Sequence, residues 1–302
     1  MKLDVTTKNM NVLECFSSET RVRIIELLNG GPYNIGELAE ALGLSSAIIT
    51  KHIQKLEEAG IVSTESMVGK RGTQKRCSLN MDELVLVLRT APVLEKSPDT
   101  TRYTVDIPVG QYIRYQVQPT CGLASPEKRI GMMDDPRYFD DPEHTQAEHL
   151  WFASGFVEYR IPNYLVGRAE ASSMTISLEL CSEAPQYNEN WPSDITFSVN
   201  DTDVATWTCP GDFGSRRGVY TPSWWNDTQY GLQKTISITQ EGTFIDGIRF
   251  SDVAIGQLGI RAGQELRFRI ACPETAAHCG GVSLFGKGFG NYPQDIRVTI
   301  AL

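Results

Sequence analysis

The spacing of apolar residues changes once along this chain of 302 residues, and that change limits what the chain can fold into. Up to about residue 90 apolar residues recur at helical intervals, as in Ile49, Ile53 and Leu56. Farther on, alternating or β-branched segments such as MTISLEL and IRVTIAL are separated by clusters of Gly, Pro, Asn and Asp. The sequence therefore predicts a mainly helical domain in residues 1–90, a linker in 91–101 and an all-β sandwich, jelly-roll in type, in 102–302.

Charge and composition narrow the possible functions. Residues 1–90 hold eleven basic and eleven acidic side chains, so the remainder carries the whole net charge of −9, which disfavours nucleic-acid binding there. The first residues contain no apolar run of the length that a signal peptide needs, and nowhere do eighteen apolar residues run together, so we expect a soluble, cytoplasmic protein with no membrane contact. The seven scattered cysteines predict reduced, mostly buried thiols.

Residues 35–60 have the layout of two helices joined by a tight turn. Gly43 is the glycine expected where the first helix ends, and Ser45 is a suitable N-cap for the second. Because the second helix buries its apolar stripe, its opposite face carries small, polar and basic groups near the N-terminus, which suit a DNA major groove. With the cap, these residues are Ser45, Ser46, Ala47, Thr50, Lys51 and Gln54.

The segment IVSTESMVGKRGTQKRCSL, which follows Gly60, predicts two strands with a basic tip. Its cations are placed to lie along phosphates or in the minor groove, and they are Lys70, Arg71, Lys75 and Arg76. Two helices followed by a basic β-wing make a winged helix-turn-helix. A winged helix used only for protein contacts is the alternative, but both the helix face and the wing fit DNA.

The run SSETRVRIIELLNGGPYNIGELAEALGLSSAIITKHIQKLEEAGIVSTE resembles the ArsR-type bacterial transcriptional regulators, and the resemblance covers about residues 12–80. It implies a homodimer that binds a double-stranded operator of two half-sites, with flanking helices around residues 5–16 and 81–90 forming the dimer. Metal-sensing members carry a Cys-x-Cys pair where this chain has Gly36-Glu37-Leu38. We therefore expect no metal sensing and no cofactor. His52 is expected to pack or face the dimer, and not to read bases.

The five tryptophans all lie in the predicted β domain. Aromatic faces beside Asp, Asn and Arg are typical of carbohydrate sites, although core packing also explains tryptophans in a sandwich. The candidate ligand rim consists of Trp191, Asp194, Arg216, Trp224, Asn226, Lys287 and Tyr292. Residues 170–300 also resemble, more weakly, carbohydrate-binding sandwiches and the jelly-roll domains that follow an ArsR-type head in some regulators. A small effector, with a carbohydrate favoured, is the resulting expectation.

Motifs for catalysis and metal binding are weak, so we predict a regulator and not an enzyme. The spacing of His144 and His149 misses the i, i+4 geometry of a zinc protease helix, which favours a solvated acidic segment. The segment from Cys272 to Cys279 lacks the fourth ligand that a structural zinc site needs. The segment Asp201-Thr-Asp203 predicts a hairpin and not a calcium loop. The glycine-rich stretch VSLFGKGFGNYPQDI lacks the phosphate-loop spacing and predicts a wide turn with glycines at positive φ. Two alternatives stay open: a sugar-active enzyme with a DNA-binding head, and a β domain that only mediates oligomerisation.

Overall fold

The computed structural model describes residues 2–69, 72–88 and 101–302, and the chain divides into two compact units, Met1–Thr90 and Ala91–Leu302. Lys70, Arg71 and all but the last residue of the predicted linker lie outside the described residues. In the described ranges, no helix is long and apolar enough to cross a membrane.

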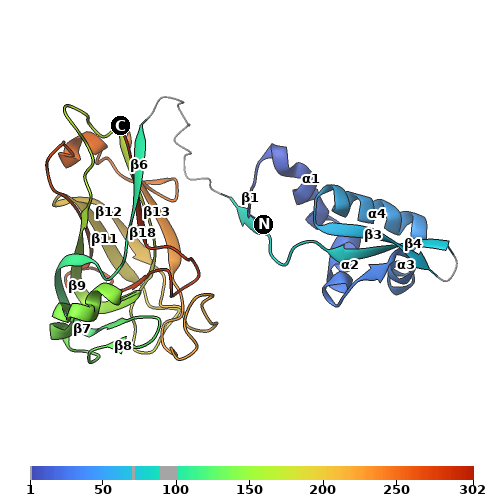
Figure 1. The fold of residues 1–302 in the computed structure, drawn as a ribbon, viewed down its shortest axis with the longest axis horizontal. Coiled ribbons are helices and arrows are strands. Elements are labelled where there is room, and N and C mark those ends of the chain that lie inside the picture. Colours follow the sequence, from blue (N-terminus) through green and yellow to red (C-terminus); the bar gives the residue numbers. More distant parts are fainter. Residues whose placement is uncertain (1, 70–71, 89–100) are drawn as a thin grey trace. The chain divides into compact units, whose positions relative to one another are not determined.

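The N-terminal unit is a winged helix-turn-helix with a three-stranded sheet of order β2-β4-β3 (Figure 1). The helical segments η1, α1, η2 and α2 precede the helix-turn-helix, which α3 and α4 form, and a separate parallel pair, β1 and β5, joins the two ends of the unit. The elements are β1 (Lys2–Asp4), η1 (Thr7–Asn9), α1 (Met10–Leu13), η2 (Glu14–Ser17), α2 (Glu19–Asn29), β2 (Tyr33–Asn34), α3 (Ile35–Leu42), α4 (Ser46–Glu58), β3 (Val62–Gly69), β4 (Gly72–Leu79) and β5 (Val85–Val87).

The helix boundaries follow from local chemistry. Asn34 Oδ1 accepts from Glu37 N at 2.9 Å while Glu37 Oε2 accepts from Asn34 N at 2.8 Å, a reciprocal cap that starts α3. Gly43 ends α3 in the left-handed region, with φ of 64°, and the Ser45 side chain caps α4. The predicted turn between the two helices is confirmed.

The core of this unit contains the predicted stripe Ile49, Ile53 and Leu56 of α4. Arg21 is also buried, where it donates to the backbone carbonyls of Glu14 and Cys15. These carbonyls lie in η2, so the guanidinium supplies partners to groups that a helix end leaves unsatisfied. Arg21 thereby ties the short N-terminal helices to α2.

The prediction of a helix around residues 81–90 is wrong over its described part. Residues 85–87 form β5, which pairs in parallel with β1 in the register Leu3 with Leu86. The segment Val-Leu-Val has a β-branched residue at each end, which favours extended backbone. So short a helix would also be marginal without an apolar face to bury. The expected helical character of residues 5–16 is confirmed by η1, α1 and η2.

The C-terminal unit is all-β, apart from short 3-10 turns. The predicted strand segments, such as MTISLEL and IRVTIAL, are confirmed. Two long strands, β7 (Tyr112–Ala124) and β9 (His149–Ile161), lie next to each other in one layer of the unit. The strands are β6 (Arg102–Ile107), β7 (Tyr112–Ala124), β8 (Arg129–Ile130), β9 (His149–Ile161), β10 (Ser173–Cys181), β11 (Ser193–Val199), β12 (Thr202–Cys209), β13 (Leu232–Thr239), β14 (Gly242–Ile245), β15 (Ile248–Ser251), β16 (Leu266–Cys272), β17 (Val282–Phe285) and β18 (Ile296–Ala301); the turns are η3 (Pro136–Asp140), η4 (Pro142–Gln146) and η5 (Ile255–Leu258).

These strands make a near-closed sandwich. One layer runs β12-β11-β16-β9-β7-β8 and the other β15-β14-β13-β10-β18-β6. Strand β17 joins the layers because it pairs with β9 on one side and with β10 on the other. At the opposite edge Ser251 Oγ of β15 donates to Val204 O of β12 at 2.5 Å.

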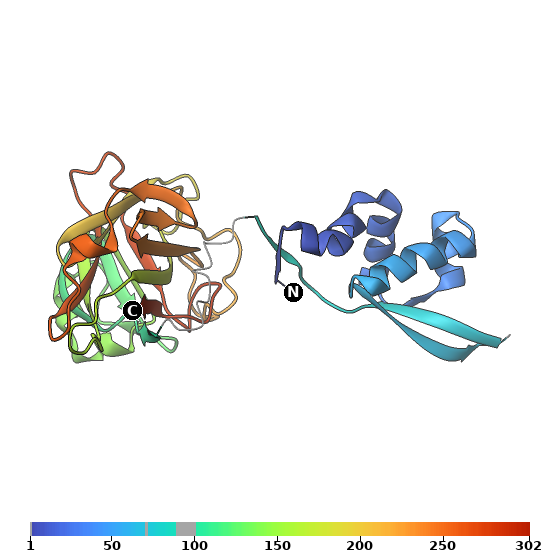
Figure 2. The same ribbon diagram turned by 90° about the horizontal axis from the view of Figure 1, so that it is seen from above.

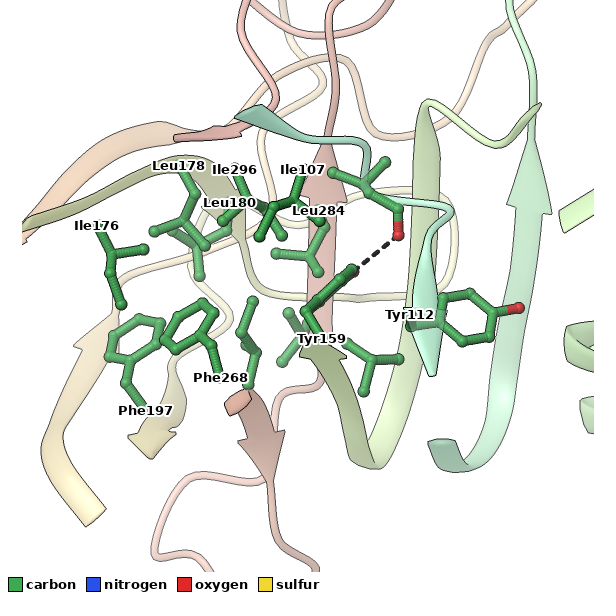
Figure 3. Packing of buried hydrophobic residues seen from close by; sticks show 14 of the residues in the cluster. Ile107, Tyr112, Tyr159, Ile176, Leu178, Leu180, Phe197, Phe268, Leu284 and Ile296 are labelled. Atoms are coloured by element: carbon green, nitrogen blue, oxygen red, sulfur yellow. Dashed lines mark hydrogen bonds between the residues drawn. The ribbon is translucent and has the colours of Figure 1, made fainter. Parts of the chain in front are cut away.

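The sandwich core is formed by side chains that alternate inward from both layers. In Figure 3 Phe197 and Phe268 of one layer face Ile176 and Leu178 of the other. Tyr159 is fully buried, and its hydroxyl donates to Val109 O at 2.8 Å, so its polar end is satisfied.

Two predicted turns can be compared with the structure. Asn200 and Asp201 both have positive φ between β11 and β12, so the predicted hairpin is confirmed. The glycine-rich stretch connects β17 to β18 as expected, but within it only Gly290 has positive φ. Gly288 serves a different purpose, because its backbone approaches Glu148 so closely that a Cβ would lie 2.5 Å from Oε2. Gly288 is therefore explained by this close approach of the backbone, and not by the positive φ that the sequence predicted.

Candidate functional site

The exposed face of α4 lies opposite the buried stripe, as predicted. Ser46, Ala47, Lys51 and Gln54 are exposed, and Thr50 is half-buried with its hydroxyl donating to Ser46 O at 2.7 Å. Two rows at i, i+4 spacing result, because residues four apart lie on one side of a helix. The face therefore offers one amide and one ammonium group beside small side chains at the helix N-terminus, a shape and chemistry that fit a major groove.

Ile48 is a part of this face that the sequence interpretation missed. It is 44% exposed, whereas its neighbour Ile49 is completely buried. Adjacent helix residues point about 100° apart, so two consecutive isoleucines cannot both enter the core. An exposed apolar side chain beside Ala47 and Lys51 is suited to a thymine methyl group.

His52 is half-buried on the same helix. Burial lowers its pKa, and the nearby positive charges of Arg21 and Lys55 lower it further. The imidazole is therefore neutral at pH 7 and adds no charge to the face.

The wing is formed by β3 and β4, seen as the cyan ribbon that extends beyond the helices in Figure 2. Lys75 and Arg76 are both exposed. Because successive strand residues point to opposite faces, the two cations lie on opposite sides of the ribbon. The register places Glu65 directly across from Arg76 and Ser66 across from Lys75. A carboxylate thus offsets the charge on the Arg76 side, and Lys75 is the stronger candidate for a phosphate contact. Lys70 and Arg71, also predicted here, are outside the described residues.

A separate pocket of about 230 Å³ lies in the β unit. It is lined by β7, by β9, and by loops that follow β8, follow β10 and precede β13. The lining residues are Thr120, Met133, Asp134, His149, Trp151, Glu183, Ala184, Pro185, Gln186, Trp225, Asp227 and Thr228.

Aromatic rings form one side of this pocket. His149 stacks on Trp151 with ring centroids 5.2 Å apart, and Trp151 lies 5.2 Å from Trp225. His149 Nδ1 lies 2.9 Å from Leu284 O. Burial lowers the pKa of His149 to about 4, so the ring is uncharged at neutral pH.

Carboxyl groups form the other side of the pocket. Glu183 is buried and accepts from the hydroxyls of Thr120 and Ser283, each at 3.0 Å. Burial raises the pKa of Glu183 well above its ordinary value, and the neighbouring carboxyl of Asp212 adds to the effect. Burial likewise raises the pKa of Asp212 to about 7. Burial therefore disfavours the negative charge of Glu183, which lines the pocket, and of Asp212, which lies behind it.

Asp212 lies behind the pocket wall. Its Oδ2 accepts from Ala184 N at 2.9 Å and from Thr228 Oγ1 at 3.0 Å, and both of these residues line the pocket. Its Oδ1 is buried and has no hydrogen-bond partner within the described parts of the chain. Such a group is unusual in a folded protein.

The seven residues predicted as a ligand rim do not line this pocket. Several have contacts of their own within the fold: Asp194 accepts from Thr208 Oγ1 at 2.7 Å, Trp224 Nε1 donates to Pro126 O at 2.7 Å, and Lys287 Nζ lies 3.0 Å from Asp295. The remaining four are Trp191, Asn226 and Tyr292, which are exposed, and Arg216, whose guanidinium lies 4.7 Å from the ring centre of Tyr230. The predicted rim and the pocket are therefore different places.

The sequence interpretation also missed His149 as a pocket residue. Its segment was predicted to be solvated and acidic, but β9 begins at His149 and buries it. His144 lies apart from it in η4, where Nδ1 is 2.7 Å from Gly110 O. The run HLWFASGFVEYRI was the available signal, because a long apolar segment indicates a central strand and not a solvated loop.

The helix-turn-helix region of this chain is similar to known proteins. Residues 18–64 match the family model described as bacterial regulatory protein, arsR family. An uncharacterized HTH-type transcriptional regulator of Methanocaldococcus jannaschii is 42% identical over 52 residues, which cover 17% of this chain and 55% of that protein. The transcriptional repressor SdpR of Bacillus subtilis is 36% identical over 53 residues, covering 18% and 59%. The chain thus spans little more than half the length of these two relatives.

Two solved structures are also similar. One is an ArsR family transcriptional regulator, 25% identical, which covers 24% of this chain and 74% of its own, with a TM-score of 0.21. The other is HlyU from Vibrio cholerae, 26% identical, covering 24% and 76%, with a TM-score of 0.21. Residues 18–64 thus match the model of the arsR family, and a large all-β unit follows them in the same chain.

Proposed function

We propose that this protein is a DNA-binding transcriptional regulator whose α4 inserts its N-terminal half into the major groove of an operator. The observation that carries the proposal is the division of α4 into a buried apolar stripe and an exposed face of small, polar and basic groups. The wing supplies Lys75 for the phosphate backbone next to that groove. The family match of residues 18–64 supports the same docking.

The protein acts as a homodimer on two half-sites, because one helix-turn-helix reads only a few base pairs. It does not respond to metal through a cysteine pair at the start of α3. At that place the Glu37 side chain is engaged in the cap with Asn34, and the nearest cysteine in the sequence on either side is Cys15 or Cys77, both buried in the core.

The β unit senses a small effector and conveys its presence to DNA binding. Its pocket, with aromatic groups on one side and carboxyl groups on the other, supports this role because such pockets bind small ligands. A carbohydrate remains the favoured class from the sequence, and its C–H faces would stack on indole rings. The cytoplasm is the compartment that a regulator of this kind requires.

The test is selection of duplexes from a random pool by the full-length protein, followed by footprinting on the selected site. A dimer should select an inverted repeat with half-sites roughly 10 base pairs apart, on one face of the DNA. Recovery of no enriched sequence at low salt would refute the proposal. A sugar-active enzyme, the alternative reading of the β unit, would instead hydrolyse chromogenic glycosides in the absence of DNA.

A further inference from the structure

The pocket between Trp151 and Glu183 has the size of a small metabolite. Its volume of about 230 Å³ lies below the range of about 300 to 1,000 Å³ that is usual for drug-sized ligands. Two residues of its rim, Asp134 and Gln186, have positive φ, with values of 60° and 68°. Non-glycine residues in this conformation cluster at ligand sites, because the surrounding structure must hold them there.

Hydrogen bonds fix the position of Asp134. Its Oδ1 accepts from Cys121 N at 3.0 Å, and its own backbone N–H donates to Cys121 O at 2.7 Å. The carboxylate at the rim is therefore held in place before any ligand arrives. A site organised in advance loses less entropy on binding.

The charges in the pocket are unbalanced. Asp134, Glu183 and Asp227 are among its lining residues, and none of the lining residues is Lys or Arg. Arg129 lies nearby, but it already pairs with Asp227 at 3.1 Å. Glu183 receives its hydrogen bonds from neutral hydroxyls, and Asp212 behind the wall has neutral donors as well. A buried carboxyl group without a cation is costly to ionise.

The aromatic side of the pocket also favours positive charge. Indole rings attract cations through their negative faces, and Trp151 and Trp225 both line the site. Arg129 already uses this property, because its guanidinium lies 5.2 Å from the centre of the Trp225 ring. The neutral His149 ring does not oppose a cation.

We propose that this pocket binds a small organic cation, an amine no larger than a monosaccharide, with its ammonium group beside Glu183 and its carbon skeleton against Trp151. The amine is the effector of the regulator, so this inference rests on the proposed function of the β unit. Thr120, Thr228 and Gln186 add groups that hydrogen-bond hydroxyls. An amino sugar has both features and is the most suitable member of the class.

The experiment is calorimetric titration of the full chain with four probes. Glucosamine and choline are the cations, whereas glucose and N-acetylglucosamine are matched neutral sugars. We expect the cations to bind at least tenfold more tightly than the neutral sugars. Glu183→Gln should weaken cation binding at least tenfold, while Glu241→Gln, at an exposed carboxylate of the β13–β14 turn, should leave it unchanged. If Glu183→Gln fails to fold, Asp134→Asn at the exposed rim should weaken cation binding severalfold.

Four outcomes would overturn the inference: no probe binds, the neutral sugars bind as tightly as the cations, the pocket variant that folds binds cations as the wild type does, or Glu241→Gln has the same effect as the pocket variant. The titrations are repeated while operator affinity is measured. Glu183-dependent amine binding that leaves operator affinity unchanged would support the site and refute its effector role. Failure to bind any DNA would refute the proposed function while the amine titration still decides the pocket.

Discussion

Replacement of Lys51 by Ala tests the docking of α4 most directly. Lys51 is exposed and lies about 8 Å along the helix axis from Ser46, in the half of α4 that is proposed to enter the groove. Its side chain makes no hydrogen bond or ion pair within the described residues. Truncation should therefore change the free energy of unfolding by no more than about 0.5 kcal/mol.

The effect on DNA binding should be much larger. A side chain that contacts a base edge contributes about 1 to 3 kcal/mol of discrimination, which corresponds to a roughly 5- to 150-fold loss of operator affinity. Binding to a scrambled duplex should change little if Lys51 contacts a base. If it contacts a phosphate, both affinities should fall, and the slope of log affinity against log salt should decrease by about 0.9.

Fluorescence anisotropy on labelled operator and scrambled duplexes, at several salt concentrations, separates these cases. Lys55→Ala is the matched control, because Lys55 is an exposed lysine in the last turn of α4, outside the half of the helix that is proposed to enter the groove. Unchanged operator affinity for Lys51→Ala, or an equal loss for Lys55→Ala, would refute the proposed docking of α4.

Three further predictions concern stability and reactivity. Gly43→Ala should lower the stability of the N-terminal unit by about 1 to 2 kcal/mol in urea unfolding, because φ of 64° strains an L-residue. Gly30→Ala, at φ of −79°, should be nearly neutral, and equal effects of the two substitutions would contradict this reasoning. Burial raises the pKa of Glu179 from 4.5 to about 7, so the folded state holds more protons than the unfolded state between these values. The free energy of unfolding of the β unit should then fall as pH rises from about 5 to 7, by an amount on the order of 3 kcal/mol at most, and a rise over this window would exclude the assignment. Cys279 is the one exposed cysteine, and burial together with the nearby Cys272 raises its pKa to about 11. Native protein at pH 7 should therefore react slowly with a thiol reagent, at no more than one site per chain, and rapid labelling of several cysteines would contradict this prediction.

Local patterns in the sequence were sufficient for the helix-turn-helix. The stop at Gly43, the cap at Ser45 and the stripe of Ile49 and Ile53 depend on backbone conformation and on neighbours within one or two helical turns. The same holds for the hairpin at Asn200, because its turn needs only residues that accept positive φ. Such features are predictable because each is decided by a few consecutive residues.

The segment at residues 85–87 was different, because its strand depends on a partner at the other end of the unit. The pairing of Leu86 with Leu3 cannot be deduced from the spacing of either segment. The family resemblance suggested a helix there, and tertiary pairing gave a strand. Secondary structure of short, apolar segments is commonly decided in this way.

The residues that line the pocket could not be predicted from the sequence either. The sequence shows that the β unit contains tryptophans and acidic residues. Only the fold decides that Trp151 and Trp225 line the pocket while Trp191 does not, and that Glu183 is the carboxyl group buried in its wall. These residues come from a central strand and from loops far apart in the chain, which the sandwich brings to one place. The sequence by itself determined the helix-turn-helix and the all-β character of the remainder, because both follow from local spacing. Only the tertiary structure decided which side chains surround the pocket and which carboxyl groups it buries, because burial depends on neighbours that no local pattern specifies.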